Sequence, residues 1–146
     1  MNFIKEISAQ ETYAVRHPVL RTNKPIESCI FANDSLASTK HFGFYFNNNL
    51  IGVLSVFFNK NSAFKTDTQF QIRGMAVLKE HQNKGYGALL VKHCETYIKI
   101  ENGTLIWLNA RENAVPFYKK LGYKINGEAF IIENVGLHYI MIKEIG

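Results

Sequence analysis

The chain has 146 residues, 47% of them hydrophobic and 20% charged, with a formal net charge of +5. These values are ordinary for a soluble globular protein, and the length predicts a single domain, residues 1–146, with a real core. No apolar run approaches the roughly 20 residues that span a bilayer, and the N-terminus lacks the basic-then-apolar plan of a signal peptide. Cys29 and Cys94 are too few for a disulfide scaffold and lack metal-site spacing. We therefore expect reduced cysteines, a cytoplasmic location, no membrane partner and no bound metal.

The basic excess, 17 Lys and Arg against 12 Asp and Glu, suits an anionic ligand such as a nucleic acid, an acidic surface or a polyphosphate cofactor. A solvated surface that is simply basic explains it equally well. Lys119-Lys120 is the densest basic pair, and the sequence lacks a basic stripe with interleaved aromatic residues. We therefore expect no nucleic-acid partner and use the charge only as support for an anionic ligand.

The chain begins with a predicted strand and helix. Phe3 to Ile7 alternates as a strand does. Ser8 and Glu11 form a capping box, which predicts a helix that starts near Ala9. Pro18 should interrupt or end this helix, because proline lacks the N–H that a helix needs.

A largely irregular segment and a hairpin follow. Residues 21–38 are rich in turn formers, with a short helix expected near 26–31. Residues 41–46 and 50–59 are rich in aromatic and β-branched side chains. Asn47-Asn48-Asn49 lies between them and predicts the turn of a β-hairpin, because asparagine tolerates left-handed conformations.

The second half alternates strands and helices. Residues 69–78 predict a strand, and a helix follows from Gly85. The apolar residues that should form the buried face of this helix are Tyr86, Leu89, Leu90, Cys94, Tyr97 and Ile98. Asn102-Gly103 should end it, and residues 104–109 predict the next strand.

A short helix is then expected, capped by Asn113 or a neighbour, with Pro116 in its first turn and Gly122 at its end. Strand pieces are expected around the turn Asn126-Gly127, and a final strand closes the chain. These last strands are predicted at residues 123–125, 129–133 and 137–143. The unit from Gln69 to Asn109 implies a parallel crossover and the hairpins imply antiparallel pairs, so we expect a mixed α/β sheet with helices on both faces.

The stretch from Ile72 to Leu90 is the most informative part of the sequence. Glycines at the helix entry, Gly85-Tyr86-Gly87, leave backbone N–H groups free at the positive end of the helix dipole, which favours an anion such as a phosphate. A dinucleotide fingerprint needs a third glycine or alanine where Leu90 stands, and a P-loop needs Gly-Lys-Ser or Gly-Lys-Thr. A plain helix start with glycines for close packing remains the alternative.

Two motifs together resemble the GNAT superfamily of N-acetyltransferases. The first is Gln82-x-x-Gly85-x-Gly87 after a strand that ends in M-A-V-L, and the second is the run N-A-R-E-N-A-V-P-F-Y-K-K-L-G-Y over 109–123. Strand and helix order also agree, least clearly over residues 1–38. The resemblance implies the acyl-CoA N-acyltransferase fold: a mixed, mostly antiparallel twisted sheet with a central parallel splayed pair and helices on both faces. It implies acetyl-CoA as co-substrate.

The resemblance assigns the donor site mainly to backbone groups. Residues 75–77 would bind the pantetheine arm, with a bulge near Gly74 that splays the strand and the amide of Val77 or a neighbour facing the thioester. Asn109 and Asn113 lie where the family contacts the pantetheine or orients the site, although Asn113 is equally explained as a helix cap. The strand residues assigned to the pantetheine are Met75, Ala76 and Val77, and those assigned to the pyrophosphate are Gln82, Asn83, Lys84, Gly85, Tyr86 and Gly87.

Proton transfer is less fully assigned. Tyr118 aligns with the tyrosine that the family uses as general acid, although a core tyrosine is the alternative. Many members place a base on the strand before the loop, but residues 69–73 hold no carboxylate. Glu133 and His138 are the candidates, each with a structural or solvent-facing alternative. Three arginines that could orient an acidic substrate are Arg16, Arg21 and Arg73.

We therefore predict an N-acetyltransferase that moves an acetyl group from acetyl-CoA to a primary amine by direct attack. A non-catalytic acyl-CoA-binding or sensing module on the same fold is the alternative. The acceptor, a small molecule or a peptide, is not readable from the sequence. The oligomeric state is equally open, a homodimer included.

Overall fold

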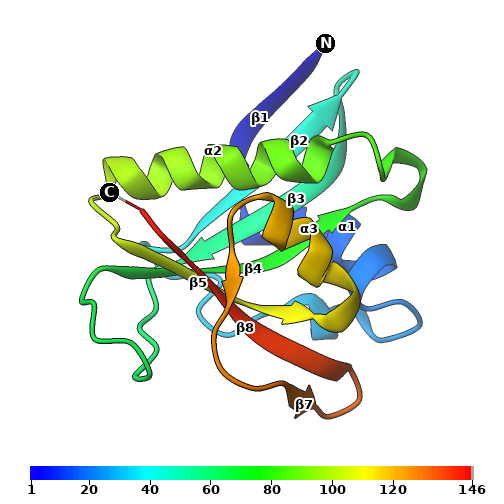
Figure 1. Cartoon of the computed structure of the whole chain (residues 1–146). Coiled ribbons are helices and arrows are strands. Elements are labelled where there is room, and N and C mark those ends of the chain that lie inside the picture. Colours follow the sequence, from blue (N-terminus) through cyan, green and yellow to red (C-terminus); the bar gives the residue numbers. More distant parts are fainter. Residues whose placement is uncertain (146) are drawn as a thin grey trace.

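The computed structural model of the chain describes residues 1–145. Eight strands in this range form one sheet in the order β1-β2-β3-β4-β5-β8-β6, with β7 paired to β8 (Figure 1). The strands are β1 (Asn2–Ile7), β2 (Lys40–Phe46), β3 (Asn49–Phe57), β4 (Gln69–Val77), β5 (Leu105–Arg111), β6 (Lys124–Ile125), β7 (Phe130–Ile132) and β8 (Gly136–Glu144). Only β4 and β5 pair in parallel, which confirms the mixed sheet.

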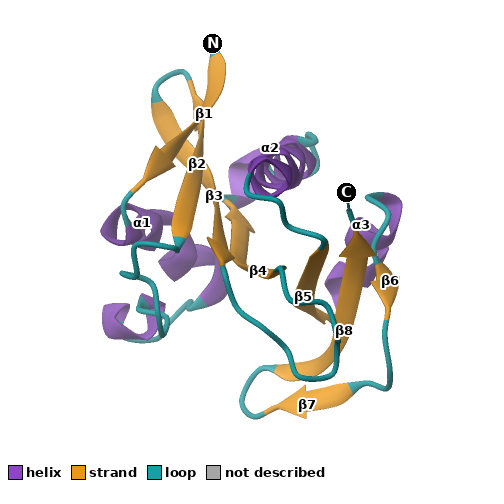
Figure 2. Cartoon of the chain, turned by 90° about the vertical axis from the view of Figure 1, so that its left-hand side faces the viewer, coloured by secondary structure: helices purple, strands orange, loops and turns teal. Residues whose placement is uncertain are grey.

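Helices cover both faces of this sheet, as predicted (Figure 2). The α-helices are α1 (Ala9–Leu20), α2 (Tyr86–Ile100) and α3 (Val115–Lys120), and the short 3-10 helices are η1 (Ile26–Cys29), η2 (Lys79–His81) and η3 (Glu112–Ala114). Within residues 1–145, no helix combines the length and apolar character needed to cross a membrane. Both cysteines are free and buried.

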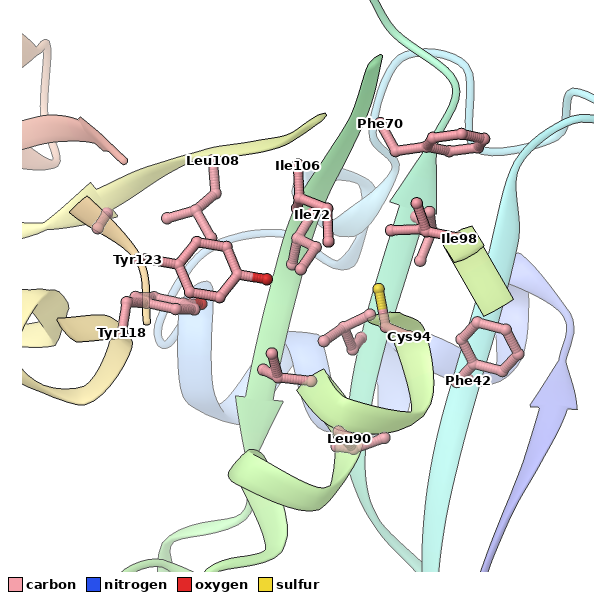
Figure 3. Packing of buried hydrophobic residues seen from close by; sticks show 14 of the residues in the cluster. Phe42, Phe70, Ile72, Leu90, Cys94, Ile98, Ile106, Leu108, Tyr118 and Tyr123 are labelled. Carbon is pink, nitrogen blue, oxygen red and sulfur yellow. The ribbon is translucent and has the colours of Figure 1, made fainter. Parts of the chain in front are cut away.

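The larger core lies between the sheet and the helices α2 and α3 (Figure 3). Leu90, Cys94 and Ile98 of α2 pack there against Ile72 of β4 and Ile106 of β5. A smaller core lies on the opposite face, between the sheet and α1, and consists of Ile7, Val15, Val53 and Ala76. The central strands are therefore buried on both sides, which explains their nearly continuous apolar runs.

Local signals placed most elements correctly. The Ser8–Glu11 capping box is present at the start of α1. Asn47 and Asn48 take φ values of 49° and 67° in the β2–β3 turn, the conformation that this turn needs. Gly122, with φ of 96°, follows α3.

Four local predictions were wrong or incomplete. The helix α1 continues through Pro18 to Leu20, because the proline lies in the last turn. Asn113 is not a side-chain cap, since α3 is preceded by η3. The strand pieces on either side of Asn126-Gly127 were predicted without stated partners, and each of them, β6 and β7, pairs with β8. On α2, Leu89 is 48% exposed whereas Val91 is fully buried, so the buried face is rotated from the predicted one.

Candidate functional site

The central feature of the site is the separation of β4 from β5. These strands pair only where 69–71 meets 105–107, and beyond that point they diverge (Figure 1). A cleft of about 780 Å³ opens there. It is lined by the diverging halves of both strands, the start of α2, the end of α1, one side of α3 and parts of β7 and β8.

A bulge in β4 aims this strand at the cleft. Ser55 pairs with Arg73 and Val53 pairs with Ala76, so β4 has one more residue than β3 in this interval. Gly74 adopts φ of +64°, which a glycine accepts without strain. The extra residue reverses the side-chain alternation: Ile72 belongs to the α2-side core, whereas Ala76 belongs to the α1-side core. The bulge that the sequence placed near Gly74 is therefore present.

The bulge leaves β4 with an unpaired backbone edge toward β5. The N–H of Leu78 donates to the carbonyl of Ile51 over 2.8 Å, so it faces β3. Because backbone groups alternate along a strand, those of Val77 face the opposite, open side. The Val77 carbonyl accepts a hydrogen bond from Nε2 of Gln82 over 2.9 Å. Its N–H faces the cleft from the same edge, where an extended ligand can receive hydrogen bonds as an added strand would.

The loop after β4 delivers free N–H groups to one end of the cleft. Asn83 and Gly85 adopt left-handed conformations, with φ of 63° and 84°. The first helical bond of α2 runs from the N–H of Leu89 to the carbonyl of Gly85, so the amides from Tyr86 to Ala88 precede the helical ladder. No acidic residue occupies the first turn. This geometry suits a phosphate.

The predicted donor-site residues differ in their placement. Met75, Ala76, Val77, Gln82, Asn83, Gly85, Tyr86, Gly87, Asn109 and Asn113 all line the cleft. Lys84 is exposed and lies outside the lining. The Gln82 side chain is tied to Val77, so it holds the loop against β4.

Tyr118 lies in the cleft wall and is buried, with its ring 5.0 Å from that of Phe117 and 5.8 Å from that of Tyr123 (Figure 3). Burial, with a smaller contribution from Cys94, raises the pKa of the Tyr118 phenol well above its ordinary value. The phenol is therefore protonated at neutral pH, as a proton donor must be. The hydroxyl of Tyr123, by contrast, donates a hydrogen bond to Oε2 of Glu95 over 2.9 Å.

Of the two candidate bases, His138 lines the cleft and Glu133 does not. His138 on β8 is buried, lines the cleft and faces Arg111 across the β5–β8 pair. Its Nδ1 lies 2.8 Å from the carbonyl of Gly136, so Nδ1 carries the proton and Nε2 keeps its lone pair in the neutral ring. Glu133 is exposed and outside the lining, so the structure does not bring it to Tyr118 or His138.

The three arginines named from the sequence differ in whether they line the cleft. Arg16 is fully buried and donates to both carboxylate oxygens of Asp34, at 2.7 and 3.1 Å, so it does not line the cleft. Arg21 and Arg73 do line it, together with Arg111, which sequence reasoning missed. The signal for Arg111 was available, because it lies two positions after Asn109 on the same side of β5.

Comparisons with known proteins point to one family. The model of the acetyltransferase (GNAT) family matches residues 3–123. A Bacillus subtilis (strain 168) protein named uncharacterized N-acetyltransferase YitI is 32% identical over 140 residues, covering 96% of this chain and 94% of that protein.

Solved structures share the fold at low identity. ElaA of Escherichia coli has a TM-score of 0.78 at 16% identity and covers 99% of this chain and 100% of its own. An aminoglycoside 6'-N-acetyltransferase in complex with coenzyme A has a TM-score of 0.78 at 15% identity, with 97% of this chain and 96% of that chain covered. These structures support the predicted fold.

Proposed function

Because the chain belongs to the GNAT family of acetyltransferases, we propose that it transfers the acetyl group of acetyl-CoA to a primary amine by direct attack. One observation carries the proposal. A single cleft combines the open backbone edge of β4, the free N–H groups at the start of α2 and the buried phenol of Tyr118. These are the groups that an extended thioester with a pyrophosphate requires.

Donor binding rests mainly on backbone groups. The open edge beside Val77 offers hydrogen bonds to the amide-containing pantetheine arm. The amides from Tyr86 to Ala88 and the dipole of α2 receive the pyrophosphate. Glycine is needed at position 85 because the backbone there is left-handed. At position 87 glycine is needed because the first turn of α2 has little room for a side chain. A Cβ on Gly87 would lie 3.2 Å from Cε of Met75 and 3.3 Å from Cζ of Phe117.

The chemistry then needs two proton transfers. The acceptor nitrogen bonds to the thioester carbon, and the N–H of Val77 faces the edge where the oxyanion develops. The carbon–sulfur bond breaks with its electron pair on sulfur, and Tyr118 gives its proton to that thiolate. Nε2 of His138, directly or through one water, accepts the proton that the amine loses.

Detection of both products tests this function. Purified protein is mixed with acetyl-CoA and a panel of primary amines, and free CoA and the acetylated amine are measured by mass spectrometry. Equal amounts of both products are expected for at least one amine. Acetyl-CoA binding without amine-dependent CoA release would contradict transfer and would favour a non-catalytic acyl-CoA-binding module.

A further inference from the structure

Three guanidinium groups converge on the cleft from three different elements. Arg73 comes from β4, Arg111 ends β5, and Arg21 follows the last turn of α1. All three line the cleft. The Cζ atoms of Arg21 and Arg73 lie 5.2 and 4.8 Å from the centre of the same Phe31 ring. We call Arg21, Arg73 and Arg111 the arginine cluster.

The arginine cluster lies on the α1 side of the diverging strands. Arg73 lies against Phe31 and Phe57, whereas its neighbour Ile72 belongs to the α2-side core. Arg111 follows Ala110, which also belongs to the α2-side core, so its side chain leaves β5 on the other face. The free amides at the start of α2 lie on the α2 side (Figure 2). The cleft therefore offers positive potential at two separate places.

The charge of the arginine cluster is only partly compensated by the protein: the guanidinium of Arg21 donates to the carbonyls of Leu20 and Ser28, and the charge of Asp34 acts favourably on Arg73. No Asp or Glu is among the described residues that line the cleft. The carboxylate of Asp34 already accepts from Arg16 and from the N–H of Phe31. Among residues 1–145, none of the three arginines forms an ion pair.

Burial and neighbouring positive charges disfavour the charged form of Arg21 and Arg73. Burial, and then the charge of Arg111, lowers the pKa of Arg21. Burial lowers the pKa of Arg73 as well; the charge of Asp34 opposes this effect, whereas the charges of Arg16 and Arg21 add to it. Arginine stays protonated despite such shifts. Three partly buried like charges without a counter-ion are costly, and an oxyanion bound between them would relieve that cost.

We propose that the arginine cluster binds an anionic group of the acceptor, so that the substrate is an amine that also carries a carboxylate or a phosphate. This inference rests on the proposed function, because it places the acceptor on the face opposite the pyrophosphate loop. Guanidinium groups pair with carboxylate and phosphate oxygens in a bidentate manner, which fixes orientation as well as charge. Polyamines and other polycationic amines are repelled by the same cluster.

Matched pairs of amines test the proposal by binding and by turnover. Each pair differs in one anionic group: an amino acid against its amide, and O-phosphoethanolamine against ethanolamine. Binding to the protein saturated with CoA is measured by calorimetry, and acetylation is measured with acetyl-CoA. We expect the anionic member of at least one pair to bind about 10- to 100-fold more tightly, the value of a charged hydrogen bond.

Variants identify the groups responsible. Arg111→Gln and Arg73→Gln should each remove about 10- to 100-fold of that affinity and leave the Kd of acetyl-CoA unchanged. Lys92→Gln, which removes an exposed positive charge of α2 outside the cleft, should change neither. If Arg73→Gln fails to fold, Arg73→Lys replaces it in the test. Lysine keeps the positive charge between the aromatic neighbours of Arg73 but lacks the bidentate guanidinium group.

The outcomes separate the two proposals. Equal or tighter binding of the non-anionic member in both pairs, tighter binding of spermidine than of either anionic amine, or binding that does not respond to Arg111→Gln overturns the anionic acceptor. Loss of acetyl-CoA affinity in the arginine variants also overturns it, because the cluster would then hold donor phosphates. Arginine-dependent binding of an anionic amine that is never acetylated supports the anionic site and refutes acetyl transfer.

Discussion

Tyr118 and Tyr123 share one aromatic cluster, with ring centres 5.8 Å apart, yet their hydroxyl groups face different surroundings. The Tyr123 hydroxyl donates to Glu95, which also accepts two hydrogen bonds from Nζ of Lys143. Tyr118 has the cleft on one side. The two residues therefore form a matched pair for mutation: Tyr118 is the proposed acid, and Tyr123 is hydrogen-bonded within the structure.

Replacing Tyr118 with Phe should lower kcat by about 100-fold, the scale of a lost general acid, with the Kd of acetyl-CoA unchanged. The aromatic ring and its packing are kept, so only the hydroxyl group that would supply the proton is removed. Tyr123→Phe is the control: it should leave kcat unchanged and cost about 1 kcal/mol of unfolding free energy for its lost hydrogen bond. Steady-state kinetics and thermal unfolding measure both. An unchanged kcat in Tyr118→Phe excludes the acid role.

His138 gives the second residue-scale prediction. Its Nδ1–H is held by the carbonyl of Gly136, which leaves Nε2 as the basic nitrogen. Because Nε2 is the proposed acceptor of the amine proton, His138→Gln should lower kcat/KM by about 100-fold and leave the Kd of acetyl-CoA unchanged. Steady-state kinetics and calorimetry measure these two quantities.

His17→Gln provides the comparison for this experiment. His17 lies near the end of α1 and contacts the carbonyl of Lys24, outside the cleft lining. This variant should keep the wild-type kcat/KM. An unchanged kcat/KM in His138→Gln would show that another group is the base.

At the scale of elements, the bulged strand β4 and the entry to α2 act together. The bulge at Gly74 turns the open edge of β4 to the cleft, and the loop then brings the first turn of α2 to the same cleft. Gly87 lies where both meet, against Met75 and Phe117. Met75 and Phe117 contact Gly87 through the ends of their side chains, so we expect the protein to fold with a larger residue at position 87. The new side chain would then occupy the cleft that Gly87 lines.

Gly87→Glu should therefore weaken acetyl-CoA binding by about 100-fold or more, because its carboxylate competes with the pyrophosphate for the helix N-terminus. Thr96→Glu adds the same charge on an exposed part of α2 and should bind acetyl-CoA normally. Calorimetry measures both variants after circular dichroism has verified their folding. Normal affinity in a folded Gly87→Glu protein would refute the loop assignment.

Local chemistry explains why most elements were predictable from the sequence. The capping box at Ser8 and the turn at Asn47-Asn48 depend on residues that are adjacent in the chain. The exchange of Leu89 for Val91 in the buried face of α2 was not predictable, because it depends on how the helix lies on the sheet. The pairing of β6 with β8 was not specified by the sequence for the same reason, since the two strands are separated in the chain.

The candidate site shows the same division. The glycine loop and Tyr118 belong to motifs that are continuous in sequence, so their positions were identified directly. Arg111 becomes meaningful only when the fold brings Arg21 and Arg73 to the same cleft. Choosing His138 over Glu133 likewise required knowing which side of the β7–β8 hairpin faces inward.

At the scale of the whole molecule, a buried polar network joins α1 to the sheet. Arg16 binds Asp34, Ser55 and the carbonyl of Cys29. Nδ1 of His41 lies 2.6 Å from the Ser55 hydroxyl, and its Nε2 lies 2.9 Å from the carbonyl of Asp34. The carbonyl can only accept, so Nε2 carries the proton and Nδ1 accepts from Ser55. The network is complete only while the His41 ring is neutral.

This network predicts how folding stability depends on pH. Burial is the main cause that lowers the pKa of His41; the hydrogen bond to the carbonyl of Asp34 and the charges of Asp34 and Glu6 oppose this effect, and the charge of Arg16 adds to it. Below the ordinary histidine pKa of about 6.5 the unfolded chain binds a proton that the folded protein resists. The unfolded state then holds more protons, so the free energy of unfolding falls as pH falls from about 7 to 5, by at most about 1.4 kcal/mol per pH unit for one group.

Thermal unfolding between pH 7 and pH 5 checks this prediction in wild type and in His41→Gln. Gln keeps a polar group at this position but does not titrate, so the variant should be less stable at pH 7 and should lose less stability on acidification. His93→Gln is the comparison: burial lowers the pKa of His93 too, so this variant should also lose less stability on acidification. It should not share the lower stability of His41→Gln at pH 7, because His93 lies on α2 and outside the network. If wild type and His41→Gln lose stability equally, His41 is not the group that links proton binding to the folding of the domain, and the neutral ring is not required for the network.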